Sequence, residues 1–188
     1  SSIMIGDTTT GTIDAANYNT GLGVDVFAAM TTGDNNVGIG FQALTSSTTA
    51  VNNVAVGSEA GDAITTGSSN TALGYQALSA LESSAANTAI GRGALAVNTA
   101  SNNTAVGRGA LEANTSAADN TAVGKSALAL NTTGTQNTAV GLAALDANTT
   151  GGNNTSVGMN SLTANTTASY NSAFGKSSLL SNTTGANN

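Results

Sequence analysis

Large and small side chains alternate in short segments along the whole chain. In a typical segment, Thr104-Ala105-Val106-Gly107, a β-branched residue is followed each time by Ala or Gly. A period of two in β-branched residues predicts a short strand with two different faces. One face stacks bulky side chains. The other is nearly bare, so we expect a second layer, or another chain, to lie close against it.

These segments recur because the chain is built on a 17-residue repeat, N-T-A-V-G-x-x-A-L-x-x-N-T-T-G-x-x in its middle copies. With the leading Asn numbered as position 1, the copies begin at Ser2, Asn19, Asn36, Asn53, Asn70, Asn87, Asn103, Asn120, Asn137, Asn154 and Asn171, and Asn188 opens a further one. The interval is 17 residues throughout, except for 16 between Asn87 and Asn103. A period this short and strict predicts a solenoid or fibre. We expect residues 1–188 to be one array and a fragment of a longer fibre.

Position 5 is Gly in all eleven copies, and no other position is as strict. Either the backbone there needs a positive φ, or a neighbouring group approaches too closely for a Cβ atom. The predicted structural turn residues are Gly6, Gly23, Gly40, Gly57, Gly74, Gly91, Gly107, Gly124, Gly141, Gly158 and Gly175. Position 4, just before this Gly, is always apolar.

Positions 6 to 11 are rich in Ala and Leu, as in residues 92–97 and 108–113. Helix propensity favours one helical turn here. An isolated turn gains nothing from propagation, however, so a second strand or a bent extended segment is slightly favoured. Both alternatives stay open from the sequence.

Positions 12 to 17 carry turn residues, typically Asn-Thr-Thr-Gly. Position 12 is apolar in several early copies, as at Met30, Ile64 and Leu81, and is Asn from Asn98 onward. Asn at a solenoid corner can adopt left-handed backbone angles and can hydrogen-bond along the stack. The corner is therefore expected to pack differently in the two halves, and the 16-residue copy near Ser101 lies close to that switch.

Each repeat offers two large apolar positions, 4 and 9, to a core. Two such side chains cannot offset the entropy of ordering 17 residues, so a lone repeat cannot fold. The predicted fold is an all-β repeat protein, a parallel β-solenoid of about eleven 17-residue coils with a short helical turn per coil as an option. At about 4.8 Å per coil the rod would be about 50 Å long. The thin core favours several chains sharing it, intertwined or packed as a homotrimer.

Composition and charge exclude several functions. The formal net charge is −6 with only four basic residues, which argues against nucleic-acid binding. No apolar run approaches the roughly 20 residues of a membrane span, so membrane insertion is not expected. The chain has no His or Cys, and its ten acidic residues are scattered. We expect no enzymatic activity, no cofactor and no metal, since Asp7, Asp14, Asp25 and Asp34 lack calcium-loop spacing.

Position 6 is the most variable position of the repeat and holds all four basic residues of the chain. Variation on a constant scaffold is typical of a binding face, although an exposed position without packing constraints would vary as well. The candidate surface-binding residues are Phe41, Tyr75, Arg92, Arg108, Lys125 and Lys176.

Position 13 is Thr in nine of the eleven copies, from Thr31 to Thr183. A regular Thr ladder on a flat solenoid face is used by ice-binding proteins. Ice binders usually carry Thr-x-Thr on one strand, whereas the Thr pair here is adjacent, so its side chains should point apart. Turn chemistry that happens to stack is the alternative interpretation.

The run N-T-A-V-G-R-G-A-L-E-A-N-T-S (103–116) and its neighbours resemble repeats of bacteriophage tail fibres, notably of cyanophage and marine phage. More loosely, they are similar to the N-S-V-A-I-G head repeats of trimeric autotransporter adhesins, which are shorter. The resemblance covers essentially the whole chain. It implies a homotrimeric parallel β-solenoid shaft, exposed on a virion, extracellularly or on a cell surface, that serves attachment.

The expected function is accordingly a structural shaft that supports attachment to a host surface. The expected partners are other copies of the chain and a cell-surface glycan or receptor. Two alternatives remain: a self-assembling extracellular filament whose subunits stack end to end, and an ice-binding β-solenoid that uses the Thr ladder.

Overall fold

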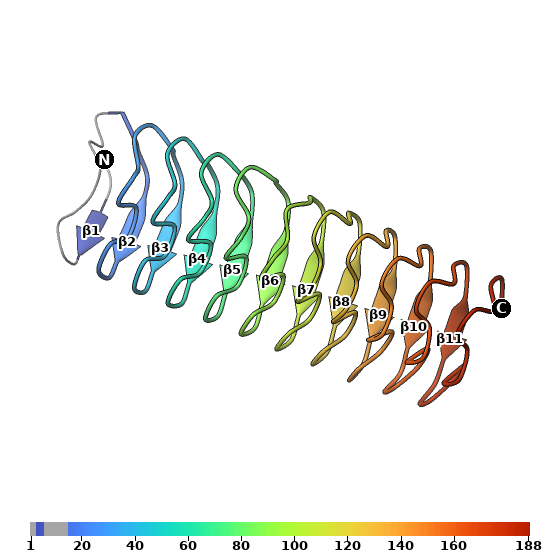
Figure 1. Ribbon diagram of the computed structural model, residues 1–188. Coiled ribbons are helices and arrows are strands. Elements are labelled where there is room, and N and C mark those ends of the chain that lie inside the picture. Colours follow the sequence, from blue (N-terminus) through green and yellow to red (C-terminus); the bar gives the residue numbers. More distant parts are fainter. Residues whose placement is uncertain (1–2, 6–14) are drawn as a thin grey trace.

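The chain folds into one column of stacked coils. A computed structural model describes residues 3–5 and 15–188 and contains a single eleven-stranded sheet in sequence order. The strands are β1 (Ile3–Ile5), β2 (Thr20–Leu22), β3 (Val37–Ile39), β4 (Val54–Val56), β5 (Thr71–Leu73), β6 (Thr88–Ile90), β7 (Thr104–Val106), β8 (Thr121–Val123), β9 (Thr138–Val140), β10 (Thr155–Val157) and β11 (Ser172–Phe174). They follow one another along the column (Figure 1), and none of the described residues is helical. The predicted parallel β-solenoid is confirmed.

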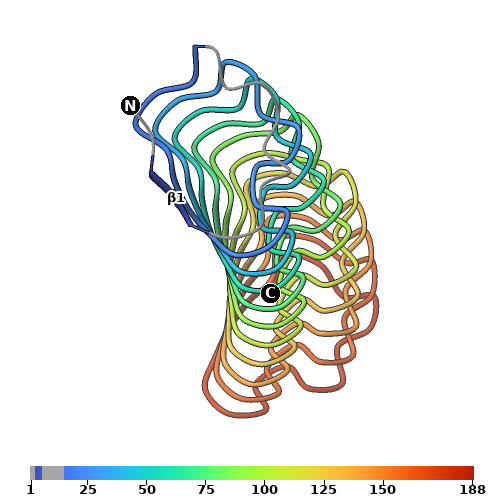
Figure 2. The same cartoon turned by 90° about the vertical axis from the view of Figure 1, so that its left-hand side faces the viewer.

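All neighbouring strands pair in parallel, with equivalent repeat positions opposite each other. The 16-residue interval keeps this register, because Thr88 pairs with Thr104 and Ile90 with Val106. The missing residue is therefore absorbed outside the strand. Successive coils are rotated relative to one another, so the column is twisted rather than flat (Figure 2). Below, coil 1 is the copy that begins at Ser2 and coil 11 the copy that begins at Asn171.

The two strand faces are the reverse of the expected arrangement. The small residue at position 3 points inward, and Ala55, Ala72 and Ala89 are at most 1% exposed. The large residue at position 4 points outward, and Leu73 is 43% exposed. The prediction that position 4 joins the core was wrong. Against the bare Ala/Gly face lies a second layer, as one of the two expectations had it, and not another chain.

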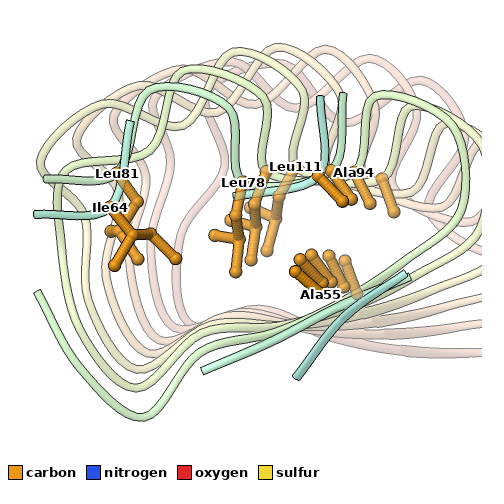
Figure 3. Close-up of a cluster of buried hydrophobic side chains, with 14 of the residues drawn as sticks. Ala55, Ile64, Leu78, Leu81, Ala94 and Leu111 are labelled. Atoms are coloured by element: carbon orange, nitrogen blue, oxygen red, sulfur yellow. The ribbon is translucent and has the colours of Figure 1, made fainter. Parts of the chain in front are cut away.

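The bare face lines the interior because the coil is narrow. The Ala at position 8 and the Leu at position 9 lie on the opposite wall and are fully buried, for example Ala77 and Leu78. Figure 3 shows Ala55 pointing from the strand wall toward the wall that carries Leu78 and Ala94. Coil 10 shows the same pairing chemically, because the Ser156 hydroxyl donates to the Ser161 carbonyl at 2.8 Å. Positions 3 and 8 thus meet across the core.

The opposite wall, positions 6 to 11, is neither a strand nor a helical turn. Its residues alternate in handedness, and positions 7 and 9 have positive φ, such as 54° at both Gln76 and Leu78. A left-handed Leu costs about 1–2 kcal/mol. This cost is offset by complete burial of the Leu78 side chain and by the hydrogen bond from its N–H to the Ala94 carbonyl at 3.1 Å. The slight preference for a second strand was wrong.

The strict Gly at position 5 is required for two reasons, a positive φ and the close approach of a neighbouring coil. Gly74 has a φ of 133°, and a Cβ atom placed on it would lie 2.7 Å from the carbonyl carbon of Gly91 in the next coil. The same geometry recurs along the column at Gly23, Gly40, Gly57, Gly91, Gly107, Gly124, Gly141 and Gly158. Gly175 has a φ of 111° with no atom within 4 Å of such a Cβ, and Gly6 lies outside the described residues. Only glycine fits this turn in the stacked coils.

A buried ladder of asparagines runs along position 1 of the coils. The Asn36 side-chain oxygen accepts from the backbone N–H of Asn53 at 2.9 Å and from its Nδ2 at 3.2 Å. The Asn53 Nδ2 also donates to the carbonyl of Gly67 at 2.9 Å. These amides tie each coil to the next, and several of them, as at Asn53, also bond to the corner of their own coil. The ladder continues to Asn188, which donates to Asn171.

A second asparagine ladder exists only in the C-terminal half, at position 12. Its side-chain amides bond in series along Asn98, Asn114, Asn131, Asn148, Asn165 and Asn182. The predicted hydrogen bonding along the stack is therefore confirmed. None of these six residues has a positive φ. The expectation of left-handed backbone at these asparagines was wrong, since positions 7, 9 and 17 carry that conformation instead.

The 16-residue coil is closed by Asn98. Its Nδ2 donates to the carbonyl of Ala100 at 2.7 Å, and its Oδ1 accepts from the N–H of Ala100 at 3.3 Å. In the following full-length coil, the Nδ2 of Asn114 reaches one residue further, to the carbonyl of Ala117. The shortened corner thus keeps its polar groups paired, which explains how one residue can be missing without a shift in register.

Candidate functional surfaces

The outer face of the sheet is an uncharged surface that runs along the column. It consists of the outward side chains at positions 2 and 4, and we refer to it as the outer strand face. Its residues in coils 2 to 11 are Thr20, Leu22, Val37, Ile39, Val54, Val56, Thr71, Leu73, Thr88, Ile90, Thr104, Val106, Thr121, Val123, Thr138, Val140, Thr155, Val157, Ser172 and Phe174. All are intermediate or exposed. Sequence reasoning missed this surface, because it assigned the large residues to the core.

The outer strand face exposes large apolar side chains in coil after coil. Leu22 is 48% exposed, Val123 37% and Phe174 69%. Scattered apolar residues are normal on a protein surface, but a contiguous apolar stripe marks an interaction site. The exposed apolar side chains repeat once per coil, at the spacing of neighbouring strands. A partner surface must carry side chains at the same spacing to contact all of them.

The predicted surface-binding residues are all exposed, but they are not all neighbours. Tyr75, Arg92, Arg108 and Lys125 occupy position 6 of four consecutive coils, 5 to 8. The Arg92 guanidinium carbon lies 5.8 Å from the centroid of the Tyr75 ring, which is cation–π distance. Phe41 lies in coil 3 and Lys176 in coil 11, so both stand apart from this group. The structure therefore separates one cluster from two isolated side chains.

A shallow hollow opens beside this cluster, on the turn wall of coils 5 to 8. Arg92, Arg108 and Glu112 contribute side chains to it, while Gly93 and Gly109 contribute only backbone. The Glu112 carboxylate lies over Gly109, because a Cβ placed on that glycine would be 3.0 Å from Glu112 Oε2. Within the described part of the chain, no ion pair joins Glu112 to either arginine. We refer to this feature as the coil 5–8 hollow.

The Thr side chains of the position 13 ladder are intermediate or exposed, but their hydroxyl protons are used in hydrogen bonds between coils. The Thr31 Oγ1 donates to the carbonyl of Thr48, and Thr48 and Thr65 donate in the same way to the next coils. The pattern recurs at Thr115, Thr132 and Thr149. These hydroxyls serve the stacking of coils, which weighs against the ice-binding alternative.

The acidic residues of the early coils form no cluster in the described part of the chain. Asp34 accepts a hydrogen bond from the N–H of Asn17 at 2.6 Å, while Asp7 and Asp14 lie outside the described residues. Among the described residues, no three His, Cys, Asp or Glu side chains are grouped to hold a metal ion. The same residues include no helix long and apolar enough to cross a membrane.

Comparison of the chain with protein-family models, with curated proteins and with solved structures finds no match. The functional argument therefore depends on the two surfaces described above, the outer strand face and the coil 5–8 hollow.

Proposed function

We propose that this chain is a shaft segment of a fibre on a virion or cell surface, in which copies associate side by side and support attachment to a host surface. The observation that supports the proposal most strongly is the outer strand face, an uncharged stripe that continues from β2 to β11. Burying its exposed apolar side chains would stabilise an assembly by the ordinary hydrophobic effect.

The period of the stripe favours another copy of the same chain as the partner. Parallel strands stack at one fixed spacing, so an identical chain in the same direction presents a matching side chain at every coil. A partner that is not itself a stack of parallel strands lacks this spacing, and an identical copy is the partner with this spacing that the chain itself supplies. Identical subunits also form closed symmetric assemblies most readily. Three copies is the number implied by the resemblance to trimeric adhesins and tail fibres.

The mass of the chain in solution tests this proposal. We expect a discrete species of three times the 18.1 kDa of one chain. Leu73→Lys introduces a charge on the outer strand face and should shift the species toward the monomer. Leu130→Lys is the matched control, because Leu130 is 56% exposed but lies at position 11, off this face. A wild-type chain that stays monomeric at high concentration would refute the proposal.

Electron microscopy of the same sample distinguishes the shaft from the end-to-end filament. Discrete rods of one length support the shaft, whereas long filaments of variable length support the alternative. Thermal hysteresis measurements address the ice-binding alternative, for which we expect no activity.

A further inference from the structure

The coil 5–8 hollow combines features that the solenoid itself does not require. Position 7 is Gly only at Gly93 and Gly109, which are neighbours in coils 6 and 7. Their φ values are 66° and 64°, but Gln76 and Ser126 adopt 54° and 56° at the same position in the adjoining coils. The backbone therefore does not need glycine here. The two glycines leave room for the Glu112 carboxylate, whose Oε2 would lie 3.0 Å from a Cβ atom on Gly109, and for a hollow of about 140 Å³ beside it.

Within the described part of the chain, the cations around this space form no ion pair, although the Glu112 carboxylate lines the same hollow. Three of the four basic residues of the chain, Arg92, Arg108 and Lys125, lie on consecutive coils, about 4.8 Å apart along the column. Apart from the contact of Arg92 with Tyr75, no interaction of these three side chains with other described residues exists. Glu112 supplies one negative charge beside these three positive ones, so the row keeps a net positive charge that favours a bound anion. The rest of the chain is acidic overall, with a formal net charge of −6.

The polar groups around the hollow match a sugar that carries an acidic group. The arginines can hold a carboxylate or sulfate through charge-assisted hydrogen bonds. The Glu112 carboxylate above Gly109 can accept hydrogen bonds from sugar hydroxyls, and Gln76 and Ser126 supply further polar groups at the two ends. The hollow has room for little more than a single ring. Three cations are too few for the many phosphate contacts on which nucleic-acid binding depends.

We propose that the coil 5–8 hollow binds an acidic polysaccharide, with one acidic sugar seated beside Glu112 and its acidic group between Arg92 and Arg108. The polysaccharide then follows the column axis, and Lys125 contacts the next acidic group. This inference deepens the proposed function, because it names the class of surface molecule that the shaft contacts. Positions 7 and 10 lie on the turn wall, opposite the strand, so binding here and self-association through the outer strand face use different surfaces.

Binding of defined oligosaccharides by calorimetry tests the site. The probes are a uronic-acid oligosaccharide, a sulfated oligosaccharide and a neutral dextran oligosaccharide of equal length, together with a single-stranded DNA oligonucleotide. We expect the uronic-acid probe, the sulfated probe or both to bind, and to bind more tightly than the neutral sugar and the DNA. Comparison of the two acidic probes shows whether the carboxylate or the sulfate is preferred.

Two variants locate the binding. Gly93→Gln fills the hollow with the residue type that coil 5 carries at this position, and Arg108→Gln removes one cation. Arg108→Gln should weaken binding at least about ten-fold, as expected for the loss of a charge-assisted contact. Gly93→Gln should weaken binding by a similar factor, because its side chain occupies the hollow. Lys176→Gln is the matched control, because it removes a cation from position 6 in coil 11, away from the hollow. Far-ultraviolet circular dichroism of each variant confirms that it is folded.

Equal affinity for DNA, or equal loss of affinity in Lys176→Gln and Arg108→Gln, would reduce the effect to general charge attraction and overturn the inference. Absence of binding to either acidic probe would also overturn it. Neither result affects the mass of the assembly, so failure of this inference is distinguishable from failure of the proposed shaft.

Discussion

The two halves of the column close the same coil in different ways. In coils 2 to 5 the interior of the corner is occupied mainly by apolar side chains, namely Met30, Ile64 and Leu81, with Ser47 between the first two. In coils 6 to 11 the same position is a ladder of asparagine amides from Asn98 to Asn182. The strand, the glycine turn and the position 1 ladder are common to both halves.

The difference shows which interactions depend on the neighbouring coil. An apolar corner is stabilised by burial, which requires only that the neighbours be apolar and of suitable size. An Asn corner is stabilised by hydrogen bonds in series, which require the same amide at the same place above and below. The Asn ladder is therefore the more specific arrangement. It also begins at the 16-residue coil, whose corner Asn98 closes.

The largest expected change in stability comes from placing an asparagine, the corner residue of the C-terminal half, in an apolar corner of the N-terminal half. In Ile64→Asn, the amide would lie between Ser47, which offers a single hydroxyl on a short side chain, and Leu81, which offers no polar group. The change combines lost apolar burial with a buried polar group that is incompletely paired, and should cost about 3–5 kcal/mol of unfolding free energy. Chemical denaturation followed by circular dichroism measures this cost.

Ile64→Leu is the control for that variant, because it keeps the volume and the apolar character and should cost less than about 1.5 kcal/mol. If Ile64→Asn were no more destabilising than Ile64→Leu, the two corners would be interchangeable and the comparison would fail.

The reverse exchange, Asn131→Leu, should cost about 2–4 kcal/mol. It removes the donor to Asn114 Oδ1, the acceptor for Asn148 Nδ2 and the donor to the Gly134 carbonyl, all of which are buried. Thr133→Leu, an exposed change in the same corner, should lie within about 0.5 kcal/mol of the wild type. A similar result for both variants in denaturant titrations would show that the ladder adds nothing beyond burial.

A smaller effect of opposite sign is expected at Ser47. Its hydroxyl is buried in the apolar corner without a hydrogen-bond partner. Ser47→Ala removes this unsatisfied group and should stabilise the column by about 1 kcal/mol. Ser161→Ala deletes a buried hydroxyl that is paired with Ser156, so it should destabilise. Thermal unfolding measures the change in melting temperature of both alanine variants. A change in the same direction for both would show that hydrogen-bond pairing of the hydroxyl is irrelevant.

The smallest effect is a pH dependence at position 10, which carries Asp62 in one half and Asp146 in the other. Burial raises the pKa of both carboxyl groups above the ordinary value of 3.8, and Glu59 adds repulsion at Asp62. One oxygen of each is buried without a partner. Because the folded-state pKa is raised, the ionised form disfavours the folded state. Stability should therefore fall as the pH rises from 3.8 through the folded-state pKa.

Asp62→Asn and Asp146→Asn should consequently stabilise the chain at neutral pH, and the gain should vanish below pH 3.8. Melting temperatures over this range measure the effect. A gain that is the same at every pH would assign it to something other than ionisation.

The period of the sequence predicted most of the architecture. It located the strands at Thr104–Val106 and its equivalents, the strict glycines and the change of the corner at Asn98. These features could be predicted because each one requires a particular residue type at a fixed position of the repeat: alternating large and small residues in the strand, a glycine in the turn, and an amide in the corner.

The orientation of the strand could not be predicted in the same way. An alternation such as Thr-Ala-Val is the same pattern whichever face is inside, and the usual assumption that the larger residues are buried placed Val106 in the core. In this narrow coil, Leu111 from the opposite wall fills the interior and leaves room only for Ala105. The left-handed backbone at Leu111 was also invisible, because leucine normally avoids that conformation.

The sequence identified only part of the candidate surfaces. The variability of position 6 identified Tyr75, Arg92, Arg108 and Lys125 from the sequence alone. The outer strand face was missed because its residues were counted as core. The coil 5–8 hollow was not predicted, because the sequence analysis did not consider the glycines at position 7, Gly93 and Gly109. The signal that could have found it is the occurrence of glycine at a position where other residues adopt the same backbone.

Disulfide formation by single cysteines tests the central claim, parallel self-association through the outer strand face, most directly. The chain contains no cysteine, so one can be introduced at a chosen site without competition. Val123→Cys lies on the face, and Leu130→Cys lies off it at a position that is more exposed, 56% against 37%. Mild oxidation should join two copies of Val123→Cys rapidly through the same residue, and should leave Leu130→Cys largely monomeric on a denaturing gel. Equal cross-linking of both variants, or none at Val123→Cys, would contradict the account.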